Sequence, residues 1–133
     1  MHVLIASSSA FRRDYYQKTL QALGHEVSLA QGGVDCIEQV ASRRPDVLML
    51  EAPLLWGGSD GVLDLLQGPQ KEAPMRVIVI AIGSGHIDWF QLSRYRVEDV
   101  LFRLPNAHEL QRSIQNLPRP PALPTGMPAV NPA

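Results

Sequence analysis

The stretch Pro45-Asp46-Val47-Leu48-Met49-Leu50-Glu51-Ala52-Pro53 decides the fold of this chain. Its centre, residues 47–50, is apolar throughout and lacks the polar–apolar alternation of a strand with one solvent-facing side. Such a run is typical of a parallel strand that helices cover on both faces. Glu51 follows at the carboxyl end of this strand, where ligands bind in open α/β sheets. Glu51 is therefore the first candidate for a functional residue.

Length and composition indicate a single globular domain of ordinary size. The chain has 133 residues, and its 12 basic and 13 acidic side chains nearly cancel, so we expect binding neither to nucleic acid nor to a membrane. The single cysteine, Cys36, excludes an internal disulfide and a multi-cysteine zinc site, and the four histidines lack metal-ligand spacing. We expect no metal and no cofactor. Without a recognisable signal peptide or membrane-spanning run, the expected location is the cytoplasm.

Five apolar runs alternate with five helical patterns along the chain. The pattern predicts an α/β fold with a doubly wound parallel sheet and helices on both faces. The predicted strands cover residues 3–6, 26–30, 47–51, 76–82 and 100–102. The helical patterns carry apolar positions over residues 11–23, 34–41, 59–67, 87–92 and 110–117, with the serines at 7–9 and Asn106 as candidate N-caps and Gly24 as a candidate C′ residue.

The composition changes at Pro118, which divides the chain into a domain of residues 1–117 and a tail of residues 118–133. Prolines recur through the tail and preclude both helix and sheet. We predict a flexible tail with polyproline character. Two Pro-x-x-Pro spacings could dock on an aromatic groove, but a disordered tail without a ligand is the favoured interpretation. The tail prolines are Pro118, Pro120, Pro121, Pro124, Pro128 and Pro132.

Several short motifs, in this order and spacing, resemble a known family. They are Leu23-Gly24-His25-Glu26-Val27, Ala30-Gln31-Gly32-Gly33-Val34, Arg44-Pro45-Asp46-Val47-Leu48-Met49-Leu50-Glu51, Asp60-Gly61 and Leu104-Pro105. Together they resemble the receiver domain of bacterial two-component response regulators, over about residues 2–117. The resemblance implies a flavodoxin-like (CheY-like) five-stranded sheet in the order 2-1-3-4-5. It also implies a role in phosphorelay signal transduction and a cis peptide bond between Leu104 and Pro105.

The positions that carry the chemistry of the family are altered in this chain. The acidic pair after the first strand falls on Ala6 and Ser7, and the phosphoacceptor Asp falls on Glu51. The Ser or Thr that ends the fourth strand falls on Ala81, and the Lys before Pro105 is Leu104. Aspartyl phosphorylation needs Mg²⁺, which binds carboxylates and water. Without the acidic pair, the hydroxyl and the lysine, we predict a degenerate phosphoacceptor site and no enzymatic activity.

Glu51 and the serine loop each leave alternatives open. The favoured interpretation of Glu51 is a solvated carboxylate at a strand end. It could instead mimic a phosphorylated Asp, or accept a phosphoryl group in an atypical but functional receiver. The serines at positions 7–9 precede a helix N-terminus, so they could bind the phosphate of a flavin or nucleotide. Ordinary N-capping by these serines is the favoured interpretation.

A dense group of aromatic and arginine side chains predicts a partner surface. Aromatic and Arg side chains are enriched at interface centres. Five such side chains lie in a window of eight residues, 89–96, in and after the fourth helical region and before the fifth strand. They are Trp89, Phe90, Arg94, Tyr95 and Arg96. The alternative is that they fill gaps around the sheet. We therefore predict a pseudo-receiver that binds a protein partner or a second copy of itself and regulates bacterial signalling without aspartyl phosphorylation.

Overall fold

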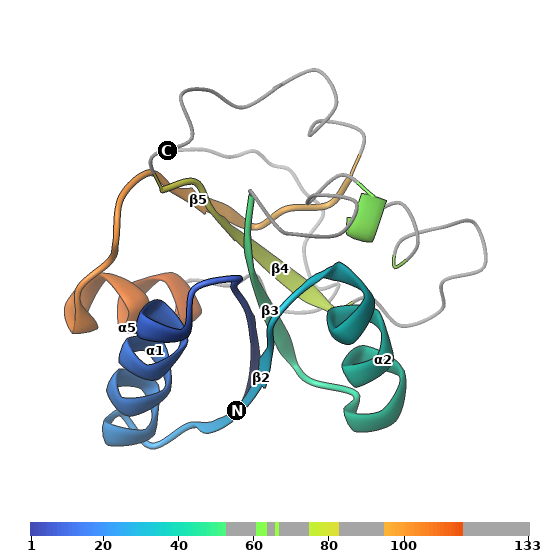
Figure 1. Cartoon of the computed structure of the whole chain (residues 1–133). Coiled ribbons are helices and arrows are strands. Elements are labelled where there is room, and N and C mark those ends of the chain that lie inside the picture. The colour runs from blue at the N-terminus through green and yellow to red at the C-terminus, as the bar shows by residue number, and fades with distance from the viewer. Residues whose placement is uncertain (53–60, 64–65, 67–74, 83–94, 116–133) are drawn as a thin grey trace.

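The computed structural model describes residues 1–52, 61–63, 66, 75–82 and 95–115. These residues contain a five-stranded, wholly parallel sheet in the order β2-β1-β3-β4-β5. Its strands are β1 His2–Ala6, β2 Glu26–Ala30, β3 Val47–Glu51, β4 Arg76–Ile80 and β5 Asp99–Leu101. The sheet confirms the predicted fold class and strand order (Figure 1).

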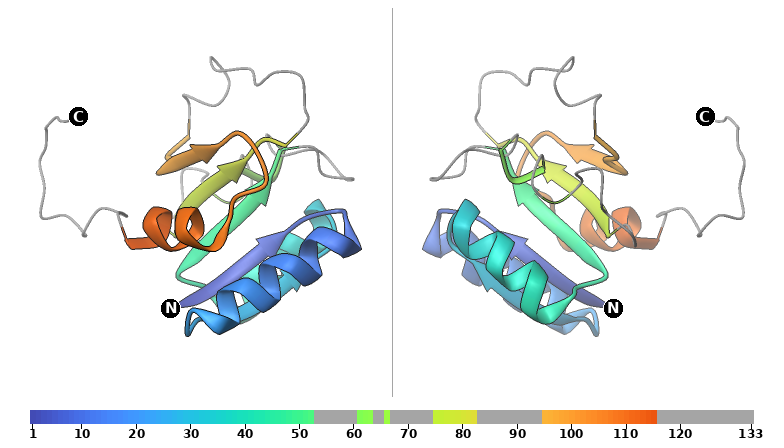
Figure 2. Two further views of the ribbon diagram at one scale, coloured as in Figure 1. Left: turned by 90° about the vertical axis from the view of Figure 1, so that its left-hand side faces the viewer. Right: turned by 90° about the vertical axis from the view of Figure 1, so that its right-hand side faces the viewer.

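Helices cover both faces of this sheet, as predicted. Helices α1 and α5 lie on one face, and α2 lies on the other (Figures 1 and 2). They span α1 Ala10–Ala22, α2 Gly33–Arg43 and α5 Ala107–Gln115. Residues 61–63 and 66 are also helical, within the range predicted as 59–67. The predicted helical region at 87–92 and the tail at 118–133 lie outside the described residues. No helix in the described part of the chain has the length and apolarity needed to cross a membrane.

Local capping explains where α1 and α5 begin. The Ser9 hydroxyl accepts a hydrogen bond from the Arg12 N–H at 3.1 Å, which satisfies one of the unpaired donors of the first turn of α1. At α5, the Asn106 side chain accepts from the Glu109 N–H at 2.8 Å, and the Glu109 carboxylate accepts from the Asn106 N–H at 3.0 Å. This reciprocal pair is a capping box. Gly24, after the end of α1, has φ of +96° and confirms the predicted C′ glycine.

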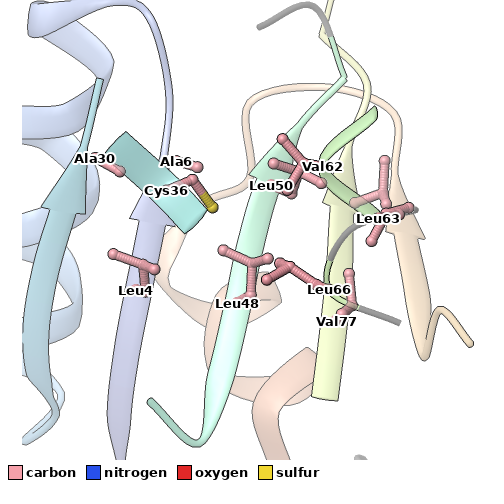
Figure 3. Packing of buried hydrophobic residues seen from close by; sticks show 11 residues of the cluster. Leu4, Ala6, Ala30, Cys36, Leu48, Leu50, Val62, Leu63, Leu66 and Val77 are labelled. Atoms are coloured by element: carbon pink, nitrogen blue, oxygen red, sulfur yellow. The ribbon is translucent and has the colours of Figure 1, made fainter. Parts of the chain in front are cut away.

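The two faces of β3 pack into two separate cores. Val47 and Met49 pack with residues of α1 and α5, whereas Leu48 and Leu50 pack into the opposite cluster, which Figure 3 shows from close by. All four side chains are fully buried, which confirms a strand that is covered on both faces. Because side chains alternate along a strand, Glu51 falls on the same face as Val47 and Met49. The register of β3 therefore directs the Glu51 side chain toward α1.

Three expectations about individual residues are wrong. Phe11 and Val34 were expected on apolar helix faces, yet they are 78% and 56% exposed. Phe11 precedes the buried Tyr16 by five residues, which rotates it about 140° away around the helix. Val34 is rotated about 160° from the buried Cys36 for the same reason. The Leu104–Pro105 bond is trans, since the described residues contain no cis peptide bond. The trans form is the ordinary state of an X–Pro bond.

Candidate functional site

Glu51 is buried, which overturns the expectation of a solvated carboxylate. It is the last residue of β3, and only 1% of its surface is exposed. The register of β3 and its contacts with α1 place the Glu51 side chain between the sheet and α1. A carboxylate taken out of water is costly to bury unless hydrogen bonds and a countercharge compensate it. The surroundings of Glu51 therefore decide what this position can do.

The Glu51 carboxylate accepts four hydrogen bonds from its own chain. Oε1 accepts from the Ser7 hydroxyl at 2.7 Å and from Arg12 Nη2 at 3.0 Å. Oε2 accepts from Arg12 Nε at 2.7 Å and from the Tyr16 hydroxyl at 2.9 Å. The two arginine bonds form a bidentate ion pair, the strongest geometry for such a contact. Because each oxygen accepts two bonds, the ordinary accepting capacity of the carboxylate is filled.

Two local features of the fold bring these donors together. The register of β1 and β3 pairs Ala6 with Leu50, which places Ser7 beside Glu51. Arg12 and Tyr16 are four residues apart in α1, so they lie on the same side of the helix. The α1 N-terminus is held to the same loop, since the Ser7 hydroxyl accepts from the Ser9 N–H at 3.2 Å. The site is thus a closed cluster, here called the Glu51 cluster, formed by Ser7, Arg12, Tyr16 and Glu51.

The electrostatics of the Glu51 cluster favour one protonation state. The hydrogen bond with Glu51 raises the pKa of Arg12 above its ordinary value, so the guanidinium stays charged. Burial, followed by the negative charge of Glu51, raises the pKa of Tyr16 far above its ordinary value, so the phenol stays a hydrogen-bond donor. The first turn of α1 has no acidic residue of its own. Glu51 supplies negative charge near this helix N-terminus, where it is favourable.

The other degenerate positions add no polar side chain that could hold a phosphoryl group. Ala6 and Ala81 are buried methyl side chains, and the Ala81 N–H donates to the Leu101 carbonyl at 2.8 Å within the sheet. Leu104 is 37% exposed. Pro105 is buried, and its carbonyl accepts from the Tyr15 hydroxyl at 2.6 Å. Of the predicted site residues, the structure therefore brings Ser7 and Glu51 into direct contact.

A metal ion would have to compete with the Arg12 guanidinium for Glu51. Divalent cations of the Mg²⁺ type bind through carboxylates and retained waters. In the part of the chain that the structure describes, no group of three or more His, Cys, Asp and Glu side chains could hold a metal ion. Arg12 already neutralises the Glu51 charge from within the chain.

Sequence reasoning missed Arg12 and Tyr16. The apolar pattern over residues 11–23 indicates only a helix that packs on the sheet, and it gives neither residue a role beside Glu51. Arg12 and Tyr16 are four residues apart directly after the serine loop. This spacing was the available signal that both side chains lie on the same side of a helix near the sheet edge. Of the predicted partner surface, Tyr95 is half-buried and Arg96 is exposed. The remaining three residues of that surface, Trp89, Phe90 and Arg94, lie outside the described residues.

Solved structures share this fold at low sequence identity. The chemotaxis protein CheY4 of Vibrio cholerae matches 87% of this chain and 97% of its own, with a TM-score of 0.78 and 16% identity. The receiver domain of a Pseudomonas aeruginosa sensor histidine kinase, which holds magnesium in its active-site cleft, matches 87% of this chain and 95% of its own, with a TM-score of 0.77 and 16% identity. The response regulator domain of Thermotoga maritima CheB matches 88% of this chain and 95% of its own, with a TM-score of 0.74 and 22% identity.

The sequence comparisons are weaker than the structural ones. No protein-family model matches the chain. A protein-glutamate methylesterase/protein-glutamine glutaminase of Myxococcus xanthus is 37% identical over 83 residues, which cover 61% of this chain. The match spans only 23% of that curated relative, about a quarter of its length. Together the comparisons show that this chain has the CheY-like fold of response regulator receiver domains.

Proposed function

We propose that this chain is a pseudo-receiver, a regulatory module of bacterial two-component signalling that acts by protein–protein interaction and without aspartyl phosphorylation. One observation carries the proposal: the side chain at the phosphoacceptor position, Glu51, is buried and accepts four hydrogen bonds from its own chain. Such a module is not an enzyme, and we expect it to act in the bacterial cytoplasm.

The Glu51 cluster opposes phosphoryl transfer. To attack a phosphodonor, Glu51 must free an oxygen, which means opening its pair with Arg12. Breaking a buried ion pair costs about 3–5 kcal/mol. Since each 1.36 kcal/mol is a tenfold change in rate, opening the pair alone slows the reaction about 100-fold or more. The hydroxyl and the lysine that assist the reaction in the family are replaced by Ala81 and Leu104.

The contacts of Glu51 also argue against its mimicking a phosphorylated Asp. In the family, the phosphoryl group is contacted from the fourth strand and from the Lys before the proline. Here the hydrogen bonds to Glu51 come from Ser7, Arg12 and Tyr16, which belong to the end of β1 and to α1. Glu51 therefore anchors α1 through Arg12 and Tyr16, and Arg12 neutralises its charge. The Ser7 hydroxyl is likewise engaged, so we do not propose a flavin or nucleotide site in this loop.

Incubation with acetyl phosphate and Mg²⁺, followed by intact-mass measurement, tests the proposal. We expect no phosphoryl adduct on this chain when it and the Vibrio cholerae CheY4 receiver are incubated in parallel under the same conditions. Titration with Mg²⁺ in the same buffer should leave the amide spectrum of residues near Glu51 unchanged at low millimolar concentration. A stoichiometric adduct that disappears in Glu51→Gln would refute the proposal and support an atypical phosphorelay receiver.

We propose that the partner surface surrounds β5. Tyr95 and Arg96 precede this strand, and Phe102 and Leu104 follow it with 60% and 37% exposure. Large exposed apolar side chains that lie close together mark interaction sites. The occupant is a protein partner or a second copy of the chain. The surface predicted from the sequence also includes Trp89, Phe90 and Arg94, which lie outside the described residues.

Alanine substitutions separate a surface role from a core role. We expect at least one of Trp89→Ala, Phe90→Ala, Tyr95→Ala and Phe102→Ala to weaken self-association in analytical ultracentrifugation, or capture of a purified partner, while leaving the melting temperature nearly unchanged. A hot-spot residue costs about 2 kcal/mol or more of binding, whereas a core aromatic costs about 3–5 kcal/mol of stability. If all four variants only destabilise the fold, the partner surface lies elsewhere.

A further inference from the structure

Two adjacent tyrosines of α1 hydrogen-bond to distant parts of the chain. The Tyr16 hydroxyl donates to Oε2 of Glu51 at 2.9 Å, and the Tyr15 hydroxyl donates to the Pro105 carbonyl at 2.6 Å. Their ring centroids are 5.7 Å apart, with a tilt of 58° between the planes. Pro105 belongs to the loop of residues 102–106 between β5 and α5. A single turn of α1 therefore contacts both the Glu51 cluster and this β5–α5 loop.

Helix geometry links these two contacts mechanically. Neighbouring residues of an α-helix point about 100° apart, so two hydroxyls bound to different elements fix both the position and the rotation of α1. A tyrosine side chain occupies a small set of rotamers, and leaving them costs free energy, so each ring resists displacement from its hydrogen-bonded position. Tyr16 is fully buried, and α1 and α5 lie side by side on one face of the sheet (Figures 1 and 2). Movement at one contact must therefore be accommodated at the other.

The β5–α5 loop is itself held as one piece with α5. The Asn106–Glu109 capping box joins the loop to the first turn of α5, and Arg103 pairs with the same Glu109 carboxylate, with its Nη1 at 3.0 Å from Oε1. Pro105 lies between these anchored residues. The exposed side chains of the loop, Phe102 and Leu104, thus lie in the same anchored segment as the Pro105 carbonyl to which Tyr15 donates.

At the other end, the Arg12–Glu51 pair is the part of the cluster that can open. Glu51 is 1% exposed, whereas the Arg12 side chain is 28% exposed. Arg12 is therefore the member of the pair that solvent can rehydrate if α1 moves. Arg12 also precedes Tyr16 by one turn of the same helix, so it follows any rotation of α1.

We infer that helix α1 couples the Glu51 cluster to the β5–α5 loop through Tyr16 and Tyr15, so that displacement of the loop loosens the Arg12–Glu51 pair. Energetic coupling of this kind is reciprocal. The inference rests on the proposed function in one respect: the proposed partner, bound near Phe102 and Leu104, is what would displace the loop. The coupling itself is a property of the chain alone.

Hydrogen exchange of the Arg12 Nε–H, measured by NMR on the full chain, tests this inference. Tyr15→Phe removes the hydroxyl but keeps the ring, and Tyr15 makes no described hydrogen bond to Arg12 or Glu51. We expect the variant to accelerate exchange at Arg12 Nε–H about fivefold, the factor that corresponds to one ordinary hydrogen bond. Glu109→Ala, which releases the loop from its α5 side, should accelerate it in the same direction. Conversely, Tyr16→Phe should shift the amide resonances of Arg103, Leu104 and Asn106.

A control variant on α5 distinguishes coupling from general loosening. Gln111→Ala removes a side-chain hydrogen bond of 3.1 Å between α5 and His25, away from the β5–α5 loop. We expect it to leave Arg12 Nε–H exchange within twofold of the parent protein. The inference is overturned if neither Tyr15→Phe nor Glu109→Ala accelerates the exchange, or if Gln111→Ala accelerates it equally. No phosphodonor is used, so either result leaves the test of phosphorylation independent.

Discussion

The Arg12–Glu51 pair should be the costliest polar contact to break among those of the described residues. Arg12→Ala removes two of the four hydrogen bonds to Glu51 together with its paired cation. Loss of one partner from a buried pair costs about 3–5 kcal/mol. We expect the lower end, about 3 kcal/mol, because Arg12 is 28% exposed and its removal admits some water. That loss is a large share of the roughly 5–15 kcal/mol that stabilises a typical domain.

Urea unfolding followed by circular dichroism measures this loss. With an ordinary urea slope of about 1–3 kcal/mol per molar, the midpoint should fall by about 1–3 M while the slope stays constant. Lys18→Ala is the matched control, because it breaks an exposed pair with Asp14 on the same helix, at 3.1 Å. An exposed pair of this kind contributes only about 0.3–0.5 kcal/mol.

A double-mutant cycle then isolates the interaction itself. Glu51→Gln keeps the shape of the side chain and should cost about 1–2 kcal/mol, since Arg12 can turn to solvent. Arg12→Ala combined with Glu51→Gln should cost at least about 1 kcal/mol less than the sum of the single variants. Additive losses, or an Arg12→Ala variant as stable as the Lys18→Ala control, would refute the view that the cluster depends on this pair.

Three further predictions follow from groups whose pKa is shifted. Burial and Glu51 raise the pKa of Tyr16, so its contribution to stability is fully present below about pH 10 and is lost as the unfolded phenol ionises above it. An absorbance titration in which every tyrosine of the folded protein ionises normally would contradict this. Burial raises the pKa of Cys36 to about 12, so iodoacetamide at about pH 8 should modify it only after urea is added. The Asn106 N–H lowers the pKa of Glu109, so its contribution is present above about pH 4.3 and is lost as the pH falls. Glu109→Gln should therefore flatten the acid limb of the urea midpoint between about pH 5 and pH 3, and an unchanged slope would argue against it.

The sequence alone determined the architecture, because the signals for it are local. The fully apolar run at residues 47–50 predicted a strand buried on both faces, and its alternation with helical patterns predicted the parallel sheet. Asn106 and Gly24 were also recognisable, since caps depend on the backbone within a few residues. The strand order came from the resemblance to receivers, and the structure confirms it.

Only the tertiary structure decided the state of Glu51. Its burial depends on the face onto which the β3 register directs it and on the side chains that α1 brings against that face. Ser7, Arg12 and Tyr16 lie 35 to 44 residues away in sequence, and no local periodicity records which of them will meet a carboxylate. The Tyr15 contact with Pro105 spans 90 residues and was equally unpredictable. Buried polar contacts depend on the exact positions of several elements at once, whereas an apolar pattern survives small shifts in any one of them.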